Sequence, residues 1–200
     1  MKKVIGLFLC ITFVLTLMSV TVSAATYHTV VKGDSMWRIA VKYEVGLSEI
    51  KAANPNIKNP DLIYPGQVLT VPTVNEKADS FEREVVRLVN IERRKNGLSE
   101  LKYNWQLCRV ARYKSEDMRD KGYFSHTSPT YGSPFQMIKN FGISYRTAGE
   151  NIAKGQTSPE AVVKAWMNSS GHRANILNPS FTEIGVGYAS GNYWTQMFIG

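Results

Sequence analysis

The pattern of hydrophobic and polar residues between about residue 26 and residue 73 predicts a definite order of strands and helices. Tyr27 to Val31 is β-branched and partly alternating, two stretches with apolar residues at helical spacing follow, and Val68 to Val71 forms a second extended run. Apolar residues three and four apart line one face of a helix, whereas alternation fits a strand. The pattern therefore predicts strand, helix, helix, strand. The apolar helix positions are Met36, Ile39, Ala40, Tyr43, Leu47, Ile50 and Ala53.

A different pattern follows from residue 80 to residue 200, where helical periods precede alternating ones. The first helix has Phe81, Val85, Leu88 and Val89 on one face and is expected to stop near Asn96-Gly97. Three further helices are expected to begin at Asn104, at Ser133-Pro134 and at Ser158-Pro159, which carry capping residues and N1 prolines. Residues 183–188 and 193–198 then form a hairpin. Helices beside an antiparallel sheet predict an α+β sandwich.

The change of pattern places a domain boundary near residues 73–79. A β-type run ends there in proline and polar residues, and a long amphipathic helix begins. The predicted organisation is a first domain over 26–73, a linker over 74–79 and a second domain over 80–200. Such a short linker tethers the two domains closely.

Residues 1–25 have the three parts of a secretory signal peptide. Met1-Lys2-Lys3 is basic, Val4 to Val22 carries no charge, and Val22 to Ala25 supplies small residues for cleavage. The alternative is an uncleaved membrane anchor, because the uncharged stretch could span a bilayer. Polar residues within it and the cleavage signal favour an exported chain with no stable membrane anchor after cleavage.

Charge and cysteine content narrow the expected environment. The formal net charge of +8 falls to +6 without Lys2 and Lys3, and a basic exported protein is attracted to polyanions such as wall teichoic polymers. No Lys/Arg run is interleaved with aromatic residues, so nucleic acid is not an expected partner. Only Cys108 remains after cleavage, which excludes an internal disulfide; we expect it to be a buried small residue on a helix.

The first domain carries a recognisable motif. Val31 to Ala40, Asn59 to Ile63 and Pro65 to Pro72 resemble a lysin motif (LysM). The resemblance implies a small βααβ module that binds N-acetylglucosamine-containing chains, meaning peptidoglycan or chitin. It also implies that the sugars lie between two loops, here Gly33 to Met36 and Asn59 to Tyr64.

These loops contain groups suited to an N-acetyl sugar. Backbone groups beside Gly33 and Asp61 can hydrogen-bond the amide and hydroxyls, and apolar side chains can bury the acetyl methyl. The alternative is that several of these residues only form turns and caps. His28, on the first strand, is expected to be exposed. The candidate glycan-binding residues are Gly33, Asp34, Ser35, Met36, Asn59, Asp61, Leu62 and Ile63.

In the second domain, polar residues gather in three segments that we expect to be loops: Phe124 to His126, Gly149 to Ala153 and Ser169 to Leu177. Together with Asn90 to Arg93 and Trp194 to Gln196, they resemble the CAP superfamily of cysteine-rich secretory, antigen-5 and pathogenesis-related proteins. This chain is similar to the cysteine-poor bacterial branch. The resemblance implies an α-β-α sandwich with an open cleft.

Many members of that superfamily place two histidines and two acidic residues in the cleft. His126 and Glu150 match one of each, whereas Tyr193 and Ser169 stand where the other two would be. His172 is the candidate substitute. His126, Glu150 and His172 have the donors for a divalent metal such as zinc, or could act in acid/base chemistry. Alternatively, His172 ties its loop to backbone carbonyls and Glu150 pairs internally.

The leading functional hypothesis is a secreted wall- or spore-associated protein that docks on peptidoglycan through LysM and presents a polar CAP cleft. A hydrolase acting on wall polymer or peptide is the enzymatic alternative, and a lipid or small-ligand carrier is a third. No Ser-His-Asp order and no HExxH zinc helix is present. The sequence leaves open whether the CAP domain is catalytic and which oligomeric state the chain adopts.

Overall fold

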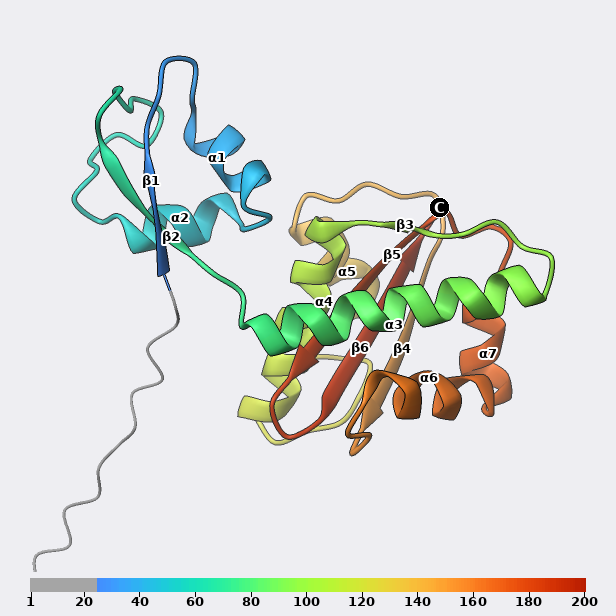
Figure 1. Ribbon diagram of the computed structural model, residues 1–200. Coiled ribbons are helices and arrows are strands. Elements are labelled where there is room, and N and C mark those ends of the chain that lie inside the picture. The colour runs from blue at the N-terminus through green and yellow to red at the C-terminus, as the bar shows by residue number, and fades with distance from the viewer. Residues whose placement is uncertain (1–24) are drawn as a thin grey trace, which may run out of the picture.

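The computed structural model describes residues 25–200 and contains a small unit and a large unit joined by residues 73–75 (Figure 1). The signal peptide predicted over residues 1–25 lies outside the described residues except for Ala25, so it stays a prediction. None of the helices between residues 25 and 200 combines the length and the apolar character that crossing a membrane requires.

The small unit has the predicted βααβ order. Its elements are β1 (Ala25–Thr29), α1 (Met36–Lys42), α2 (Leu47–Ala53) and β2 (Val68–Pro72). The strands pair antiparallel, with Ala25 opposite Pro72 and Thr29 opposite Val68. Ile39, Ile50, Leu69 and other apolar side chains from all four elements fill one buried core. The hydrophobic periodicity is thus confirmed in this unit.

Two buried polar side chains hold the small unit together. Asn54 follows α2 and bonds strand β2 in both directions, because it accepts from the Thr70 amide and donates to the Thr70 carbonyl. His28 is only 7% exposed; its Nε2 lies 2.9 Å from Asp34 and its Nδ1 lies 3.1 Å from the Tyr43 hydroxyl. The expectation that His28 is exposed was wrong, since two partners distant in sequence satisfy its ring nitrogens.

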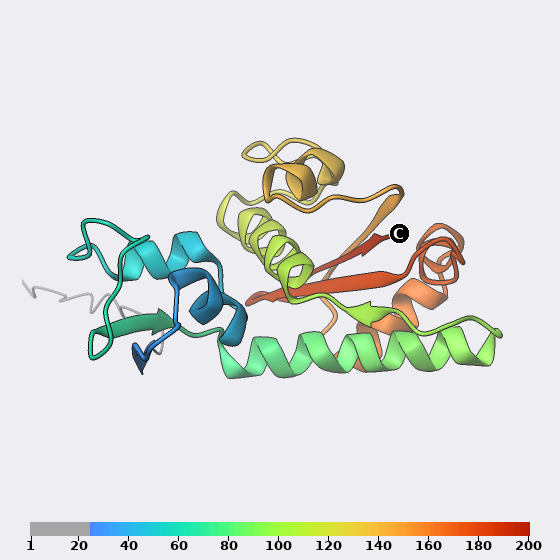
Figure 2. The same cartoon turned by 90° about the horizontal axis from the view of Figure 1, so that it is seen from above.

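The large unit is the predicted α-β-α sandwich. Its strands form a four-stranded sheet in the order β3-β5-β6-β4, in which β5 and β6 are the predicted hairpin. Helix α3 lies against one face of the sheet, and α4 and α5 lie against the other (Figure 2). The elements are α3 (Glu76–Lys95), β3 (Lys102–Tyr103), α4 (Trp105–Asp120), α5 (Pro134–Asn140), β4 (Ala148–Lys154), α6 (Pro159–Met167), α7 (Ser170–Ile176), β5 (Glu183–Ala189) and β6 (Tyr193–Ile199).

Three segments differ from the sequence-based expectation. Residues 149–153 lie in strand β4 and residues 170–176 form helix α7, although both were expected to be loops. Both faces of β4 are covered, so its side chains do not alternate between apolar and polar. Helix α3 begins at Glu76, inside the range 74–79 assigned to the linker, because Asn75 caps it by accepting from the amides of Lys77 and Ala78.

Helix α4 packs unusually close to the centre of the sheet. Gly185 and Gly187 of β5 face it, and a β-carbon at either position would overlap the α4 backbone at Leu107 and Ala111 respectively. Cys108 of α4 is buried, as predicted, and its sulfur accepts from the Val186 amide at 3.3 Å. Burial raises the pKa of this thiol to about 12, which keeps it protonated.

Candidate functional site

Strand β4 and the loop after α4 bring His126 and Glu150 into direct contact. His126 Nδ1 lies 2.7 Å from Glu150 Oε1. The two side chains differ sharply in exposure, at 56% for His126 and 2% for Glu150. The imidazole is therefore open to solvent while its carboxylate partner lies beneath it.

The environment of His126 and Glu150 raises the pKa of both groups. Burial raises the pKa of Glu150, because the charged form loses hydration. The hydrogen bond that His126 donates to the Glu150 carboxylate raises the pKa of His126. Glu150 Oε2 is buried and has no hydrogen-bond partner among the described residues. A histidine whose pKa is raised above its ordinary value by a buried carboxyl group can donate or accept a proton near neutral pH.

Two charged residues of α4 hold the loop that carries His126. The buried Lys114 ammonium donates to the carbonyls of Ser125 at 2.7 Å and His126 at 2.9 Å. One turn later, Asp117 accepts from the hydroxyls of Ser128 and Thr130, at 2.6 and 2.5 Å. Sequence reasoning missed both residues. The available signal was a lysine and an aspartate flanking the inward-facing Ser115 and Met118 of an amphipathic helix.

A cleft of about 550 Å³ opens beside the pair. His172 and Ser169 lie on its α7 side, and Trp166 and Ile152 lie on its α6 and β4 sides. Burial lowers the pKa of His172, and the nearby charge of His126 lowers it further. The backbone carbonyl of His172 accepts a hydrogen bond from the side-chain amide of Asn151 at 3.0 Å. This contact anchors α7 to strand β4. The structure thus places His126 and His172 on one cleft, and Glu150 lies buried in contact with His126.

The described fold does not bring these three side chains together as a group of metal ligands. Between residues 25 and 200, no group of three or more His, Cys, Asp or Glu side chains is arranged to hold a metal ion. Glu150 Oε1 is bonded to His126 Nδ1, so these two groups face each other rather than a common centre. Metal binding by His126, Glu150 and His172 therefore stays a prediction.

The two positions that depart from the expected tetrad have other roles. Tyr193 is buried and packs with Met118, Ile152 and Ala189 at the end of the sheet. Ser169 precedes α7 and lines the cleft with a hydroxyl instead of a carboxylate. The cleft therefore keeps one His–Glu pair and replaces the second by an aromatic core residue and a serine.

In the small domain, the side chains of several candidate glycan-binding residues make contacts within the domain itself. Asp34 accepts from the Val31 amide and from His28, Ser35 caps α1, and Met36 is buried in the core. Asn59 accepts from the Asp61 amide within its turn. These contacts match the alternative in which turn and cap residues shape the loops.

Other candidates in the two loops face solvent. Gly33 is exposed at a positive φ of 93°, and Asp61 is exposed. Leu62 and Tyr64 are 53% and 55% exposed, whereas Ile63 packs against the core. Hydrogen bonds between Val30 and the turn at residues 66–67 bring both loops to one end of the sheet. Their part in glycan binding stays a prediction.

A βααβ module joined to an α-β-α sandwich with a polar His/Glu cleft defines a two-domain architecture. Family models identify both parts: the cysteine-rich secretory protein (CAP) family matches residues 86–199, and the LysM domain matches residues 28–72. The chain belongs to the CAP family and carries a LysM domain in front of its CAP domain, as the sequence motifs predicted.

Relatives match one or both parts of the chain. The uncharacterized protein YkwD of Bacillus subtilis is 56% identical over 76% of this chain and 60% of its own length. The N-acetylmuramoyl-L-alanine amidase sle1 of Staphylococcus epidermidis is 38% identical over 44% of this chain and 26% of its own length. A crystal structure of an extracellular protein containing a SCP domain from Bacillus anthracis is 34% identical, with a TM-score of 0.60, over 68% of this chain and 47% of that one. The chain thus spans between 26% and 60% of the length of these relatives.

Proposed function

We propose that this chain is an exported protein of the cell wall or spore envelope that binds N-acetylglucosamine chains of peptidoglycan through its LysM domain. The LysM domain at residues 28–72 carries this proposal. Similarity to a wall amidase and to an extracellular SCP-domain protein supports the location. The CAP domain would then present its His126–Glu150 cleft to a ligand at the wall.

The exposed residues of the two loops supply chemistry that fits an N-acetyl sugar. Leu62 and Tyr64 present apolar surface to solvent, which an acetyl methyl or a sugar ring face can cover. Backbone groups around Gly33 and Asp61 are exposed beside them and can hydrogen-bond the amide. Asp34 and Ser35 would act indirectly, because their side chains hold the first loop in shape.

Co-sedimentation of the full chain with purified peptidoglycan tests the binding. We expect the wild-type chain to pellet with the polymer and the double variant Leu62→Ala, Tyr64→Ala to lose most of that binding. Tyr27→Ala is the matched control, since Tyr27 is also an exposed aromatic but lies on β1 outside both loops. Failure of the folded wild-type chain to pellet would contradict the proposal, and equal loss in the control would contradict the assignment to these loops. Chitin in a parallel assay distinguishes the two polymers.

One observation favours a second function, hydrolysis of wall polymer or peptide by the CAP domain. The contact of His126 with the buried Glu150 is suited to general acid/base chemistry. We expect release of soluble wall fragments to be lost in Glu150→Gln and in His126→Ala. Arg173→Ala is the control, because Arg173 is exposed on α7 and is not among the residues lining the cleft. Release that is unchanged in the first two variants would remove this function from the cleft.

A further inference from the structure

The LysM and CAP domains touch through charged side chains at two places. At the first, Glu49 of α2 receives hydrogen bonds from the Arg109 guanidinium, whose Nη2 lies 2.9 Å from Oε2, and from the Tyr113 hydroxyl at 2.6 Å. Arg109 also donates to the Ser48 hydroxyl at 2.9 Å. Helix α4 therefore presents an arginine and a tyrosine that together satisfy one carboxylate of the other domain.

The pair of Glu49 and Arg109 is substantially shielded from water. Their side chains are 23% and 19% exposed, and the guanidinium binds both carboxylate oxygens. Although burial opposes it, the hydrogen bonds from Arg109, Tyr113 and Ser48 lower the pKa of Glu49. Bidentate, partly desolvated pairs are stronger and more specific than exposed ones.

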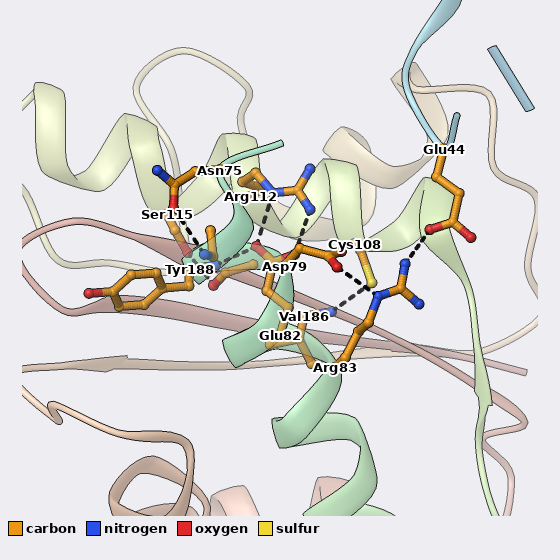
Figure 3. Close-up of polar contacts among 12 residues, drawn as sticks. Glu44, Asn75, Asp79, Glu82, Arg83, Cys108, Arg112, Ser115, Val186 and Tyr188 are labelled. Carbon is orange, nitrogen blue, oxygen red and sulfur yellow. Dashed lines mark hydrogen bonds and ion pairs between the residues drawn. The ribbon is translucent and has the colours of Figure 1, made fainter. Parts of the chain in front are cut away.

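At the second place, Glu44 reaches Arg83 at the start of α3. The Arg83 guanidinium donates to Glu44 at 2.6 Å and to Asp79 at 2.9 Å (Figure 3), and Tyr103 donates to Glu44 at 3.3 Å. Glu44 has a positive φ of 53° directly after α1, a position where glycine or asparagine is favoured. A glutamate there has a local conformational cost, and its contact with the CAP domain explains its presence.

Gly46 lies directly beside the pair of Glu49 and Arg109. Its φ of −73° and ψ of 145° suit any residue, so the local backbone does not require glycine. A β-carbon at Gly46 would instead overlap the Arg109 guanidinium and the Glu49 carboxylate. Within the LysM domain, a serine would cap α2 better. The paired Glu49 and Arg109 side chains thus occupy the space that a side chain at position 46 would take, and a larger residue there would require this pair to shift.

We propose that the face of the CAP domain made by the start of α3 and by α4 is a docking surface for the LysM domain of the same chain, which holds the two domains in one fixed orientation. The linker of residues 73–75 keeps the effective concentration of the LysM domain high, so a small interface suffices. A cavity of about 450 Å³ remains between the domains, with Arg112 and Glu116 of α4 on its CAP side.

The docked arrangement leaves the predicted glycan-binding loops uncovered. The LysM contacts come from Glu44, Ser48 and Glu49, which lie outside residues 33–36 and 59–64. Helix α4 binds the LysM domain through Arg109 and Tyr113 and holds the His126 loop through Lys114. Docking would therefore set the position of a bound wall strand relative to the cleft.

Backbone ¹⁵N relaxation of the full chain tests the proposal, because it reports a separate rotational correlation time for each domain. We expect one common correlation time in the wild type at physiological salt. Arg109→Glu should shorten the correlation time of the LysM amides relative to those of the CAP domain, and Glu49→Arg added to Arg109→Glu should restore the common value. Glu84→Gln is the control, since Glu84 pairs with Arg87 within α3.

Two variants separate docking from folding. Gly46→Ser and Glu44→Gly should each keep or raise the stability of the LysM domain, for the local reasons above, and yet uncouple its tumbling from that of the CAP domain. Spectra with native dispersion in both domains verify that the fold is kept. Different correlation times in the wild-type chain, or a common one that survives both Arg109→Glu and Gly46→Ser, would overturn the proposal. These results are independent of peptidoglycan binding.

Discussion

The two domains differ in the kind of polar side chain that each buries. The LysM domain buries the side chains of Asn54 and His28, and each is hydrogen-bonded by residues of the same domain. The CAP domain buries full charges, among them Glu82, Arg93 and Lys114. Transferring a charge from water is costly unless it is paired and hydrogen-bonded. A small core has little free energy with which to offset that cost, so the difference follows the size of the two cores.

Within the CAP domain, the buried charges fall into two groups. Glu82 is bonded by Arg112 at 2.9 and 2.5 Å and by the Tyr188 amide at 3.0 Å (Figure 3). Arg93 donates to the carbonyls of four residues, Ser99, Ile176, Asn178 and Phe181. Glu150, by contrast, has one oxygen without a partner among the described residues. Full satisfaction marks a structural charge, and incomplete satisfaction marks the candidate site.

The largest effect is expected from breaking the structural pair. Arg112→Met leaves the Glu82 carboxylate buried without its cation, and we expect the CAP domain to lose about 3–5 kcal/mol of unfolding free energy. Urea unfolding followed by tryptophan fluorescence measures the loss. The double variant Glu82→Leu, Arg112→Met removes both charges and should recover most of the stability. A double variant no more stable than the single one would show that the cost lies in packing rather than in charge.

A second substitution tests how closely α4 approaches the sheet. Gly187→Ala places a methyl group against the Ala111 backbone, and overpacking of this kind costs about 1–3 kcal/mol. Gly171→Ala is the matched control, since a β-carbon there meets open space in helix α7. Denaturant midpoints of the two variants give the comparison. Equal midpoints would mean that α4 withdraws without cost.

In the LysM domain, the corresponding test is removal of its buried amide. Asn54→Ala leaves the amide and carbonyl of Thr70 unpaired, which we expect to cost about 1–3 kcal/mol. Because this core is small, the thermal midpoint of the LysM domain should fall visibly in NMR melting curves. Asn56→Ala, at an exposed position, should leave the midpoint unchanged. A similar fall in both variants would argue against a stabilising role of the Asn54 hydrogen bonds to Thr70.

The smallest effect concerns protonation of His126. Glu150 raises the pKa of His126 by hydrogen bonding, so Glu150→Gln should lower it, as a ring-proton NMR titration would detect. A raised folded-state pKa stabilises the fold below the ordinary value of 6.5 and loses that contribution as pH rises through the folded-state pKa. The variant should therefore show a weaker loss of stability over that range. An unchanged His126 titration would mean that the pair does not share a proton.

Features of the fold that depend on residues close together in the sequence could be predicted from the sequence. Asn104, Ser133 and Ser158 cap helices as expected, because a cap acts within three residues. The β5–β6 hairpin was also predicted, with Asn192 in the left-handed conformation at its turn. The LysM domain is short enough for such local signals to describe nearly all of its fold.

Features that depend on contacts between distant residues could not be predicted in this way. The polar sequence of residues 149–153 predicts a loop, whereas the fold gives these residues partners on α7 and β6, such as Asn151 with Gln196 at 3.0 Å, and they form strand β4. Lys114 was missed because only the folded structure places two loop carbonyls beside it. Family resemblance identified His126 and Glu150, but only the folded structure shows that they are in direct contact and differ in burial.

Strand β4 forms one edge of the sheet and also carries Glu150. An open edge invites strand addition by a neighbouring chain. Here Asn175 of α7 donates to the Glu150 carbonyl at 3.2 Å and to the Asn151 side chain at 2.8 Å. Helix α7 therefore shields this edge as well as lining the cleft. A substitution that moved α7 away from the cleft would therefore also remove the Asn175 contacts from this edge.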